Sequence, residues 1–459
     1  MNIDELLKQI KRVHFIGIGG AGMCPLAEIL HHEGYELSGS DNNESDTLRR
    51  IRALGIPVAM GQRAENVDGA EMVIYTAALL PDNPELVAAR EKGIPTFERA
   101  KLFGAISRRY PNTIGICGTH GKTTVTAMTV QTAMTAGLDP SALIGGRLPM
   151  INANGRVGAS EYFICEACEF KDHFLELSPR CAVILNIDND HMEYFKTMEN
   201  MKASYTKFAD MADTVIYNGD DANTLDAVRA VSAGKTLISY GRGEGNDWSA
   251  AHITMNRGAF PEFDILYQGT LFTHVKLSVP GSHNVYNALA CAAAAHYAGA
   301  DADGIRRGVE SFTGAGRRFE ILYDKNGITV ADDYAHHPTE LEATIDTALK
   351  MEYDRVWAVF QPFTYSRTYM LMDDFARVLS KADKCVLTEI MGSREINTYG
   401  VSAEQLRAKI PGAALCDFPD GVADYLYANV QPGDLVLTLG CGDVYKAAKQ
   451  LVKKYEARG

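Results

Sequence analysis

The sequence lacks an excess of basic residues, a long apolar run and a framework of paired cysteines. Its 459 residues include 45 Lys and Arg against 58 Asp and Glu, which gives a net charge of −13. Proteins that bind nucleic acid usually present a basic face, so this balance argues against nucleic acid as a partner. It does not exclude small anionic ligands, because a local cluster of donors can hold a phosphate on an acidic protein.

Segments for export or for crossing a membrane are also lacking. The first residues, "MNIDELLKQIKRVHF", carry early acidic side chains and no long apolar core of a secretory signal. The most extended apolar run, "ALACAAAAHYAGA", is too short to span a bilayer and contains His296. We therefore expect a cytoplasmic protein with no membrane partner.

Nine cysteines are scattered along the chain, and one C-x-x-C spacing occurs, at Cys165 and Cys168. A structural zinc site would need a second pair at a similar spacing, and the sequence has none. A redox motif is the functional alternative. An odd number of cysteines without paired spacing is typical of reduced thiols, so we interpret Cys165 as part of a buried strand and Cys168 as a residue just beyond it.

Strand and helix patterns, by contrast, alternate along nearly the whole chain. Alternation of this kind predicts mostly parallel sheets covered by helices. The region 248–279 differs, because apolar and polar residues alternate there, which favours antiparallel strands or hairpins. We predict an α/β protein with three domains, at 1–106, 107–314 and 315–459.

A glycine-rich loop follows the first predicted strand, in "VHFIGIGGAGM". Gly17, Gly19 and Gly22 have the G-x-G-x-x-G spacing, and a helical pattern follows them. Such a loop can hold a diphosphate at a helix N-terminus, and Ser40 and Asp41 end the next strand, where a ribose ligand is expected. The pattern suits NAD or any other nucleotide diphosphate. A glycine turn with no ligand is the structural alternative.

A second loop, in "ICGTHGKTTVTAM", indicates a triphosphate site. An apolar strand, Thr113–Cys117, leads into the G-x-x-G-K-T-T sequence and then into a helix. Lys122 can reach the β- and γ-phosphates, and the Thr123 hydroxyl can ligate Mg²⁺. The strict phosphate-loop pattern is not met, because Ile116 stands where it requires glycine. We predict that ATP binds this loop through Gly118, Thr119, His120, Gly121, Lys122, Thr123 and Thr124.

Two side chains at predicted strand ends could complete a metal site beside this loop. Glu166 ends the strand "EYFIC", and His191 follows the strand "CAVILNI" in "DNDHM". The carboxyl ends of parallel strands meet at one edge of a sheet, and Mg²⁺ prefers hard oxygen ligands. We predict a magnesium site at Thr123, Glu166 and His191. For Glu166, a solvated acid in a loop is the alternative.

Five motifs in order give the sequence a wider resemblance: "GTHGKTT", "NIDNDHM", "PGSHNVYNALA", "GAGRRFE" and "DDYAHHPTE". In these it resembles the Mur ligases, the ATP-dependent amino-acid ligases of peptidoglycan precursor synthesis. The resemblance implies a Rossmann-like N-terminal domain for a UDP-linked substrate, a P-loop ATPase domain with a mixed sheet, and a Rossmann-like C-terminal domain that receives the amino acid. It is strongest to the branch that joins L-alanine to UDP-N-acetylmuramate. The resemblance therefore implies UDP-N-acetylmuramate and L-alanine as substrates and ATP and Mg²⁺ as cofactors. We expect a monomer or weak homodimer.

The resemblance also assigns residues. Its catalytic positions are Lys122, Glu166, His191 and Asp333. Further ATP-side positions are Asn284, Asn287 and Arg318. The substrate-side positions, the last two of them weaker, are Gly17, Gly19, Gly20, Gly22, Ser40, Asp41, His337 and Arg367.

Each of these later residues has a structural alternative. The amides of Asn284 and Asn287, three residues apart, could share a helix face and bind adenine, or could cap a helix. Arg318 could clamp phosphate or form a surface salt bridge. Asp333 could lie at the catalytic edge or make a buried structural hydrogen bond. His336 and His337, just before a proline, could simply begin a helix.

Some positions depart from the family pattern. This chain has "EACEFKD" where the family usually has "EADESD", and "QPFTYSR" where the family has "QPHRYTR". After the first glycine loop it has "MCPL" in place of a more usual stretch of small residues. These changes leave open a related ligase that adds another amino acid or a murein peptide to the same sugar nucleotide. A nucleotide-binding scaffold without catalysis is the alternative from another class. Modification of Lys202 or Lys207 to assist the metal site also stays open.

Overall fold

The computed structural model describes residues 2–77, 79–393 and 395–457. Contacts within the chain divide it into two compact units. The first unit comprises Met1–Ala251, Asp264–Val275 and Tyr286–Ser311, and the second comprises His252–Phe263, Lys276–Val285 and Phe312–Gly459. No helix among the described residues is both long and apolar enough to cross a bilayer.

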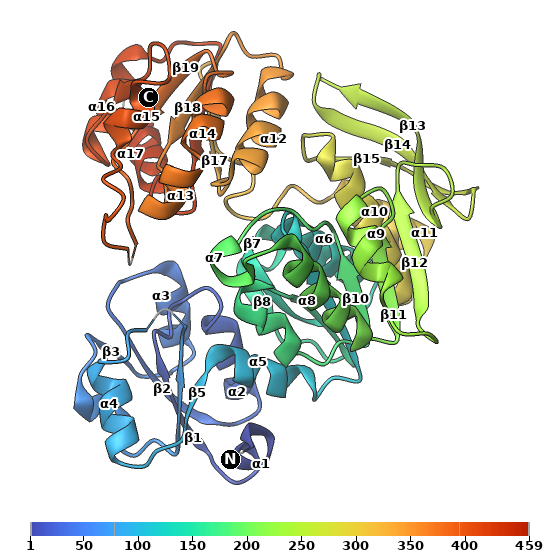
Figure 1. Ribbon diagram of the computed structural model, residues 1–459, viewed down its shortest axis with the longest axis vertical. Coiled ribbons are helices and arrows are strands. Elements are labelled where there is room, and N and C mark those ends of the chain that lie inside the picture. The colour runs from blue at the N-terminus through green and yellow to red at the C-terminus, as the bar shows by residue number, and fades with distance from the viewer. Residues whose placement is uncertain (1, 78, 394, 458–459) are drawn as a thin grey trace. The chain divides into compact units, whose positions relative to one another are not determined.

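The N-terminal sheet is parallel throughout, in the order β3-β2-β1-β4-β5 (Figure 1). Its strands are β1 Arg12–Ile16, β2 Glu36–Asp41, β3 Val58–Met60, β4 Met72–Tyr75 and β5 Thr96–Glu98. Its helices are α1 Ile3–Leu7, α2 Cys24–His32, α3 Asp46–Ala53, η1 Ala64–Val67, α4 Pro84–Glu91 and α5 Arg99–Ser107. Leu86 of α4 packs with one side of the sheet, and α2, α3 and α5 pack with the other. This is the Rossmann-like arrangement that we predicted.

The first strand is shorter than expected. It ends at Ile16 rather than Ile18, because Gly17 takes a φ of 80° and turns the chain out of the strand. The N–H groups of Gly17 and Ile18 both donate to the Ser40 carbonyl at the end of β2, at 2.8 and 3.0 Å. The glycine loop therefore begins directly at the sheet edge.

The central sheet is mixed, as predicted, in the order β15-β14-β13-β12-β11-β10-β6-β9-β7-β8. Its strands are β6 Asn112–Cys117, β7 Ser141–Leu148, β8 Ala153–Arg156, β9 Tyr162–Glu166, β10 Cys181–Ile184, β11 Thr214–Asn218, β12 Thr236–Gly241, β13 Trp248–Asn256, β14 Phe260–Tyr267 and β15 Thr270–Lys276. Pairs from β7 to β13 are parallel, whereas β7 and β8 are antiparallel. The neighbouring strands β13, β14 and β15 are joined by residues 257–259 and 268–269, connections short enough for hairpins.

Helices of the central region connect these strands. They are α6 Lys122–Thr135, η2 Pro149–Ile151, η3 Phe170–Glu176, α7 Met192–Phe195, α8 Met198–Asp210, α9 Ala222–Arg229, α10 His283–Tyr297 and α11 Ala302–Glu310. One apolar core extends from Phe15 and Leu102 of the N-terminal sheet and its helices to Phe163 and Phe208 of the central region. This shared core explains why the first two sheets belong to one unit.

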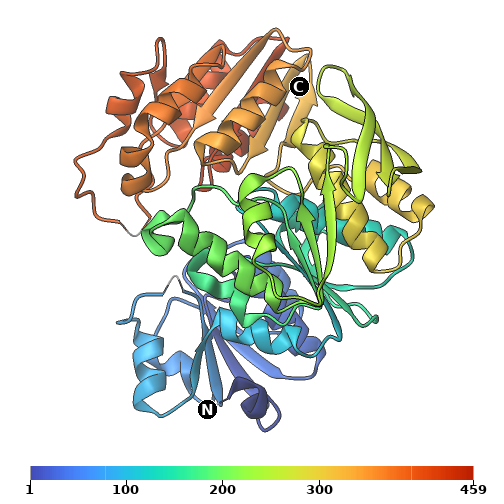
Figure 2. The ribbon, with the colours of Figure 1, turned by 45° about the vertical axis from the view of Figure 1, so that its right-hand side comes forward.

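The C-terminal sheet has the order β16-β17-β21-β18-β19-β20, with only β16 antiparallel to its neighbour. Its strands are β16 Glu320–Lys325, β17 Ile328–Asp333, β18 Arg355–Phe360, β19 Lys384–Leu387, β20 Ala414–Leu415 and β21 Asp434–Leu439. Its helices are α12 Pro338–Leu349, α13 Tyr365–Met370, α14 Met372–Leu379, α15 Ala403–Arg407, α16 Asp420–Asn429 and α17 Tyr445–Glu456. Helices α12 and α14 cover one side of the sheet, and α16 and α17 the other (Figure 2).

Two smaller expectations have an outcome in the fold. The helix predicted over "YMLMDDFARVLS" is interrupted at Leu371, which separates α13 from α14. All nine cysteines are free, with Cys165 buried in β9 and Cys168 partly exposed just beyond that strand. The structural interpretation of the C-x-x-C pair is therefore confirmed.

Candidate active site

The phosphate loop lies between the end of β6 and the start of α6, and it is braced by the chain that follows β10. The carbonyl of Asn186 accepts the N–H of Thr119 at 3.0 Å, and its side-chain oxygen accepts the N–H of His120 at 2.8 Å. The same side chain donates to the His120 carbonyl at 3.0 Å. The N–H groups of Thr119 and His120 thus shape the loop, and the first turn of α6 supplies the helix terminus that suits an anion.

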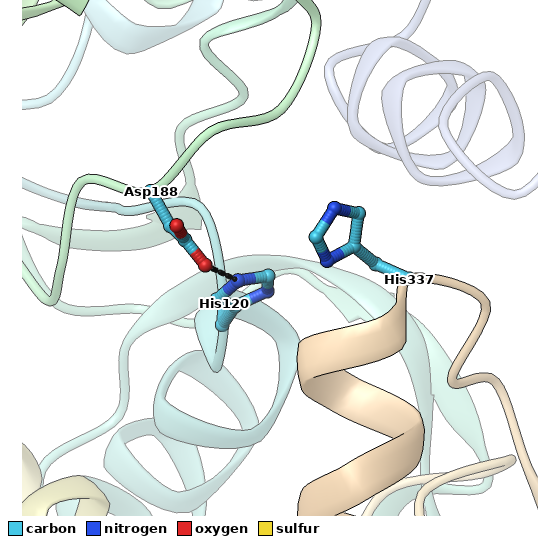
Figure 3. A group of neighbouring side chains, drawn as sticks. All are labelled: His120, Asp188 and His337. Atoms are coloured by element: carbon cyan, nitrogen blue, oxygen red, sulfur yellow. Dashed lines mark hydrogen bonds and ion pairs between the residues drawn. The ribbon is translucent and has the colours of Figure 1, made fainter. Parts of the chain in front are cut away.

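Asp188 adds a second brace to the same loop. Its carboxylate lies 2.9 Å from Nε2 of His120, a contact drawn as a dashed line in Figure 3. The Asp188 N–H donates to the Thr119 hydroxyl at 2.9 Å. Asn186 and Asp188 both lie in the "NIDNDHM" motif, but the motif by itself indicates no role for either. The sequence feature that could have identified them is their position directly after a buried parallel strand, at the sheet edge where phosphate loops lie.

Lys122 is held in a buried ion pair that the sequence did not reveal. Its Nζ lies 3.0 Å from both carboxylate oxygens of Glu169 and donates to the carbonyls of Gly118 and Thr119, at 2.5 and 3.1 Å. Burial alone would lower the pKa of Lys122, but the charge of Glu169 outweighs it and the pKa is raised. Lys122 is therefore cationic, and the side chain of Glu169, only 1% exposed, depends on it for compensation.

Thr123 and Glu166 meet directly, as the predicted metal site requires. The Thr123 hydroxyl donates to Oε2 of Glu166 at 2.9 Å, and the N–H of Gly145 in β7 donates to the same oxygen at 2.9 Å. A Cβ at Gly145 would stand 2.3 Å from that oxygen, so only glycine allows this approach. A hydroxyl and a carboxylate side by side are hard ligands of the kind that Mg²⁺ takes, so these residues fit the ion.

His191 has a different setting. It takes a φ of 55° just before α7, and its ring lies 4.9 Å from that of Phe170, measured between centroids. Its Nε2 is 3.7 Å from the carboxylate of Asp190. The part of His191 in metal binding stays a prediction.

A cavity of about 570 Å³ extends from the glycine loop to Glu166 within the first unit. It is lined by Gly17, Gly19, Gly20, Ala21, Gly22, Met23, Asp41, Asn43, Ser45, Thr76, Arg99, Leu143, Ile144, Gly145, Glu166 and Cys168. The four predicted glycines are therefore brought together with a predicted metal ligand. Arg99 and Cys168, which no motif singled out as ligands, face the same space.

Ser40 and Asp41 differ in position although they are neighbours. Ser40 is fully buried, its hydroxyl donates to Glu85 at 2.6 Å, and it is not among the described residues that line the cavity. Asp41 does line the cavity, and its carboxylate accepts the N–H of Gly19 at 3.0 Å and that of Asn43 at 3.1 Å. In this structure Asp41 shapes the glycine loop.

The two asparagines of α10 also have different surroundings. Oδ1 of Asn287 lies 3.0 Å from the position that a Cβ would take at Gly121, whose φ is 86°, so Asn287 borders the phosphate loop. The Asn284 amide instead donates to the Pro280 carbonyl at 2.6 Å, four residues earlier. For Asn284, the structural alternative of a helix-end hydrogen bond is present.

In the second unit, Asp333 holds two backbone segments together. Its carboxylate accepts the N–H groups of Phe319 and Ala335, each at 2.7 Å. Burial raises the pKa of Asp333 to about 6, against the opposing charge of Arg318. The Arg318 guanidinium lies 5.1 Å from the ring of Tyr334. The buried hydrogen bonds that we considered for Asp333 are thus observed.

His337, also drawn in Figure 3, begins α12 as its N-cap. Its ring accepts the N–H of Thr339 at 3.4 Å, while the Glu340 carboxylate accepts the His337 N–H at 3.4 Å. This reciprocal capping box is the helix start that we named as the alternative for His337. Arg367 lies in α13, and its charge opposes the burial that raises the pKa of Cys441 to about 12.

Two other lysine and arginine positions have structural partners. The neighbour of Arg318, Arg317, pairs with Asp332 at 2.8 Å and donates to the Gly440 carbonyl at 2.6 Å. Lys202 lies 3.2 Å from Asp226 on α9. Arg317 was missed because both arginines of "GRRFE" offer the same chemistry in sequence.

Three family models match successive parts of the chain. They are described as Mur ligase family, catalytic domain, over residues 12–111, Mur ligase middle domain over 116–295, and Mur ligase, glutamate ligase domain over 317–442. The chain belongs to the Mur ligase family. It is an ATP-dependent ligase with the three-domain α/β fold of that family.

Individual relatives cover nearly all of the Mur ligase chain. It is 42% identical to a UDP-N-acetylmuramate–L-alanine ligase of Caldanaerobacter subterraneus, over 99% of both chains. It is also 42% identical to the enzyme of that name from Acetivibrio thermocellus, over 97% of this chain and 96% of the relative. The crystal structure of a UDP-N-acetylmuramate–alanine ligase from Thermotoga maritima has a TM-score of 0.84 at 27% identity, covering 98% of this chain and all of the other.

Proposed function

We propose that this Mur ligase joins L-alanine to UDP-N-acetylmuramate with hydrolysis of ATP, in peptidoglycan precursor synthesis. Full-length relatives at 42% identity carry that activity in their names. One structural observation carries the proposal for this chain: a single cavity connects the glycine loop with Glu166. A sugar nucleotide whose diphosphate lies at Gly17–Gly22 could therefore extend its carboxylate toward the phosphate loop.

ATP would bind with its terminal phosphates at the start of α6. The helix N-terminus and the Lys122 ammonium would stabilise the negative charge that grows on the transferred phosphoryl oxygens. Thr123 and Glu166, with His191 as a further candidate, would hold Mg²⁺, which when bound supplies additional positive charge to the phosphates. Asn287, which borders Gly121, would contact the nucleotide, and Arg318 is a further candidate for that role.

The chemistry takes two steps. A carboxylate oxygen of the sugar nucleotide attacks the γ-phosphorus, the bond to the bridging oxygen breaks, and ADP leaves with that electron pair. The amine of alanine then attacks the acyl phosphate carbonyl and gives up a proton to a nearby base or to water. The bond from the carbonyl carbon to the phosphate oxygen breaks in the tetrahedral intermediate, and inorganic phosphate leaves with that electron pair. Phosphorylation is needed because a carboxylate has no adequate leaving group of its own.

The C-terminal residues Asp333, His337 and Arg367 are the candidates for the amino-acid step. Asp333 already accepts two backbone N–H groups, and His337 caps a helix. These hydrogen bonds shape the region. Asp333 stays the candidate to take the amine proton, and His337 and Arg367 stay candidates for the substrate side. We place the domain boundaries after residues 106 and 314, and propose a cytoplasmic monomer or weak homodimer.

An ADP-release assay tests the function directly. Purified protein with ATP, Mg²⁺ and UDP-N-acetylmuramate should release ADP in stoichiometric amounts only when L-alanine is added. Omission of each component in turn is the control. ADP release that does not depend on the amino acid would contradict the proposal.

The same assay separates the related activities. L-alanine should exceed glycine, L-serine and a murein tripeptide in kcat/KM. A preference for the tripeptide would instead identify a peptide-adding ligase, the alternative that the departures at Cys168, Phe363 and Thr364 left open.

A further inference from the structure

The hairpin of β7 and β8 touches both ends of the cavity. The strands pair antiparallel, with Ala142 opposite Arg156 and Leu143 opposite Gly155. On β7, Leu143 and Gly145 line the cavity, and the Gly145 N–H donates to Glu166 at 2.9 Å. The hairpin is therefore fixed to the carboxylate that also binds the Thr123 hydroxyl.

On β8, Asn154 reaches the opposite end. Its side chain is buried, at 4% exposure, and its amide donates to the Ala21 carbonyl in the glycine loop. The side-chain oxygen accepts from Arg50 at 3.4 Å, and Arg50 is in turn held by Glu28 at 2.5 Å. Arg50 cannot accept a hydrogen bond, so this contact orients the carboxamide with its NH₂ group toward Ala21.

We infer that Asn154 is a positioning residue that fixes the glycine loop, and the sugar nucleotide on it, at a set place relative to Glu166. The inference rests on the proposed function. Its physical basis is that Asn154 lies on β8 of the central sheet, while Ala21 lies in the loop that follows β1 of the N-terminal sheet. A paired strand resists bending, so the hairpin transmits the position of Glu166 to the glycine loop. Asn154 itself is not among the described residues that line the cavity, so it would act on the substrate through the loop.

The variant Asn154→Asp tests this with almost no change of shape. It keeps an oxygen for Arg50 but replaces the donor to Ala21 with a second acceptor, which faces the carbonyl. We expect the KM for UDP-N-acetylmuramate to rise about tenfold, with kcat within about threefold of the unchanged protein, because one buried hydrogen bond is lost. The Kd for ADP, measured without the sugar nucleotide, should stay within about twofold.

The matched control is Asn152→Asp on the same hairpin. Asn152 accepts from Arg147 at 2.8 Å and has a φ of 49°, which aspartate also tolerates. The Asn152→Asp variant should leave the KM for UDP-N-acetylmuramate and the Kd for ADP unchanged. Arg50→Gln is a second variant, in case Asn154→Asp folds poorly, and should raise the same KM by about threefold.

Hydrogen exchange gives a readout that needs no substrate. In Asn154→Asp, amides of residues 17–23 should exchange faster, while those of β6 and β9 keep their protection. An unchanged KM for UDP-N-acetylmuramate together with unchanged exchange would overturn the inference. A loss of ADP affinity as large as the rise in that KM would also overturn it, because it would indicate a general structural role for Asn154. If the unchanged protein forms no ADP with its proposed substrates, the function fails, and UDP affinity with the exchange data still decides the role of Asn154.

Discussion

The two glycine loops of the first unit each connect a strand to a helix, but they differ in how they are held. The phosphate loop at 118–121 is braced by Asn186, and the two residues after it, Lys122 and Thr123, contact the paired acids Glu169 and Glu166. The loop at Gly17–Gly22 has no lysine of its own. Three side chains brace it: the Asp41 carboxylate, the Thr47 hydroxyl, which donates to the Gly19 carbonyl, and the Asn154 amide.

The difference corresponds to the work proposed for each loop. Phosphoryl transfer needs charges that are already in place, because reorganisation during the reaction raises the barrier. Binding of a diphosphate needs a shaped backbone and tolerates more movement. Substitutions in the phosphate loop should therefore cost catalysis, and those around the first loop should cost substrate affinity.

The largest effect is expected for Lys122→Met. Activity should fall about 1,000-fold, since the transferred phosphoryl loses its cation. Stability should fall by about 3–5 kcal/mol, because Glu169 is left as an uncompensated buried charge. Steady-state kinetics and thermal unfolding measure the two effects.

The double variant Lys122→Met with Glu169→Gln separates these contributions. It should recover most of the lost stability but none of the activity. If Lys122→Met kept activity within tenfold of the unchanged protein, the conclusion that the phosphate loop supplies catalysis and the first loop supplies substrate affinity would be wrong.

Gly145→Ala should lower kcat about 100-fold, because its Cβ would displace the Glu166 carboxylate, and misplacement of about an ångström is costly. The KM for the sugar nucleotide should change little. Gly421→Ala, in α16, is the control, since its Cβ has a single side-chain neighbour at 3.2 Å. A rise in that KM with kcat unchanged would assign Gly145 to the binding side instead.

Glu85→Gln tests the foundation of the first loop. Glu85 is buried beneath it and accepts from Ser40 and Asn66, so the variant should lose about 1–3 kcal/mol at pH 7. Burial would raise the pKa of Glu85, but the nearby His14 ring and the hydrogen bonds from Ser40 and Asn66 outweigh burial, and the pKa is lowered.

The sign of the pH dependence follows from that direction. Because the folded pKa lies below the ordinary value of 4.5, the carboxylate stabilises the protein above pH 4.5, and this is lost as the pH falls further. The difference in unfolding free energy between the unchanged protein and Glu85→Gln, measured by thermal unfolding, should therefore become smaller below pH 4.5. Glu44→Gln, at an exposed pair with Arg52, should show a small gap at every pH.

The smallest effect is expected for Asp41→Ala. It removes the acceptor for the Gly19 N–H, so the KM for UDP-N-acetylmuramate should rise about fivefold with kcat unchanged. Asp68→Ala, at an exposed pair with Lys92, is the control. A rise above 100-fold would instead support the direct ribose contact that the sequence pattern predicted.

Much of the fold was predictable because it depends on local patterns. Apolar runs, glycine turns and helix periodicity gave the strands around both loops, the mixed central sheet and the buried helix α10. The boundaries were less certain, since β1 ends two residues early where Gly17 turns. For Ser40, the sequence did not show which face of the strand the side chain takes: residues at a strand end alternate between faces, and the Ser40 hydroxyl is buried against Glu85.

By itself the sequence determined the family, the order of the domains and the two loops, because these depend on residue spacing along the chain. Only the tertiary structure decided that Glu169 holds Lys122, that Gly145 holds Glu166 and that Asn154 holds the glycine loop. The contacts of Gly145 with Glu166 and of Asn154 with Ala21 each join residues more than twenty positions apart in sequence. Glu169 lies 47 residues from Lys122. Such contacts depend on how sheets and loops pack in space, which no local pattern encodes.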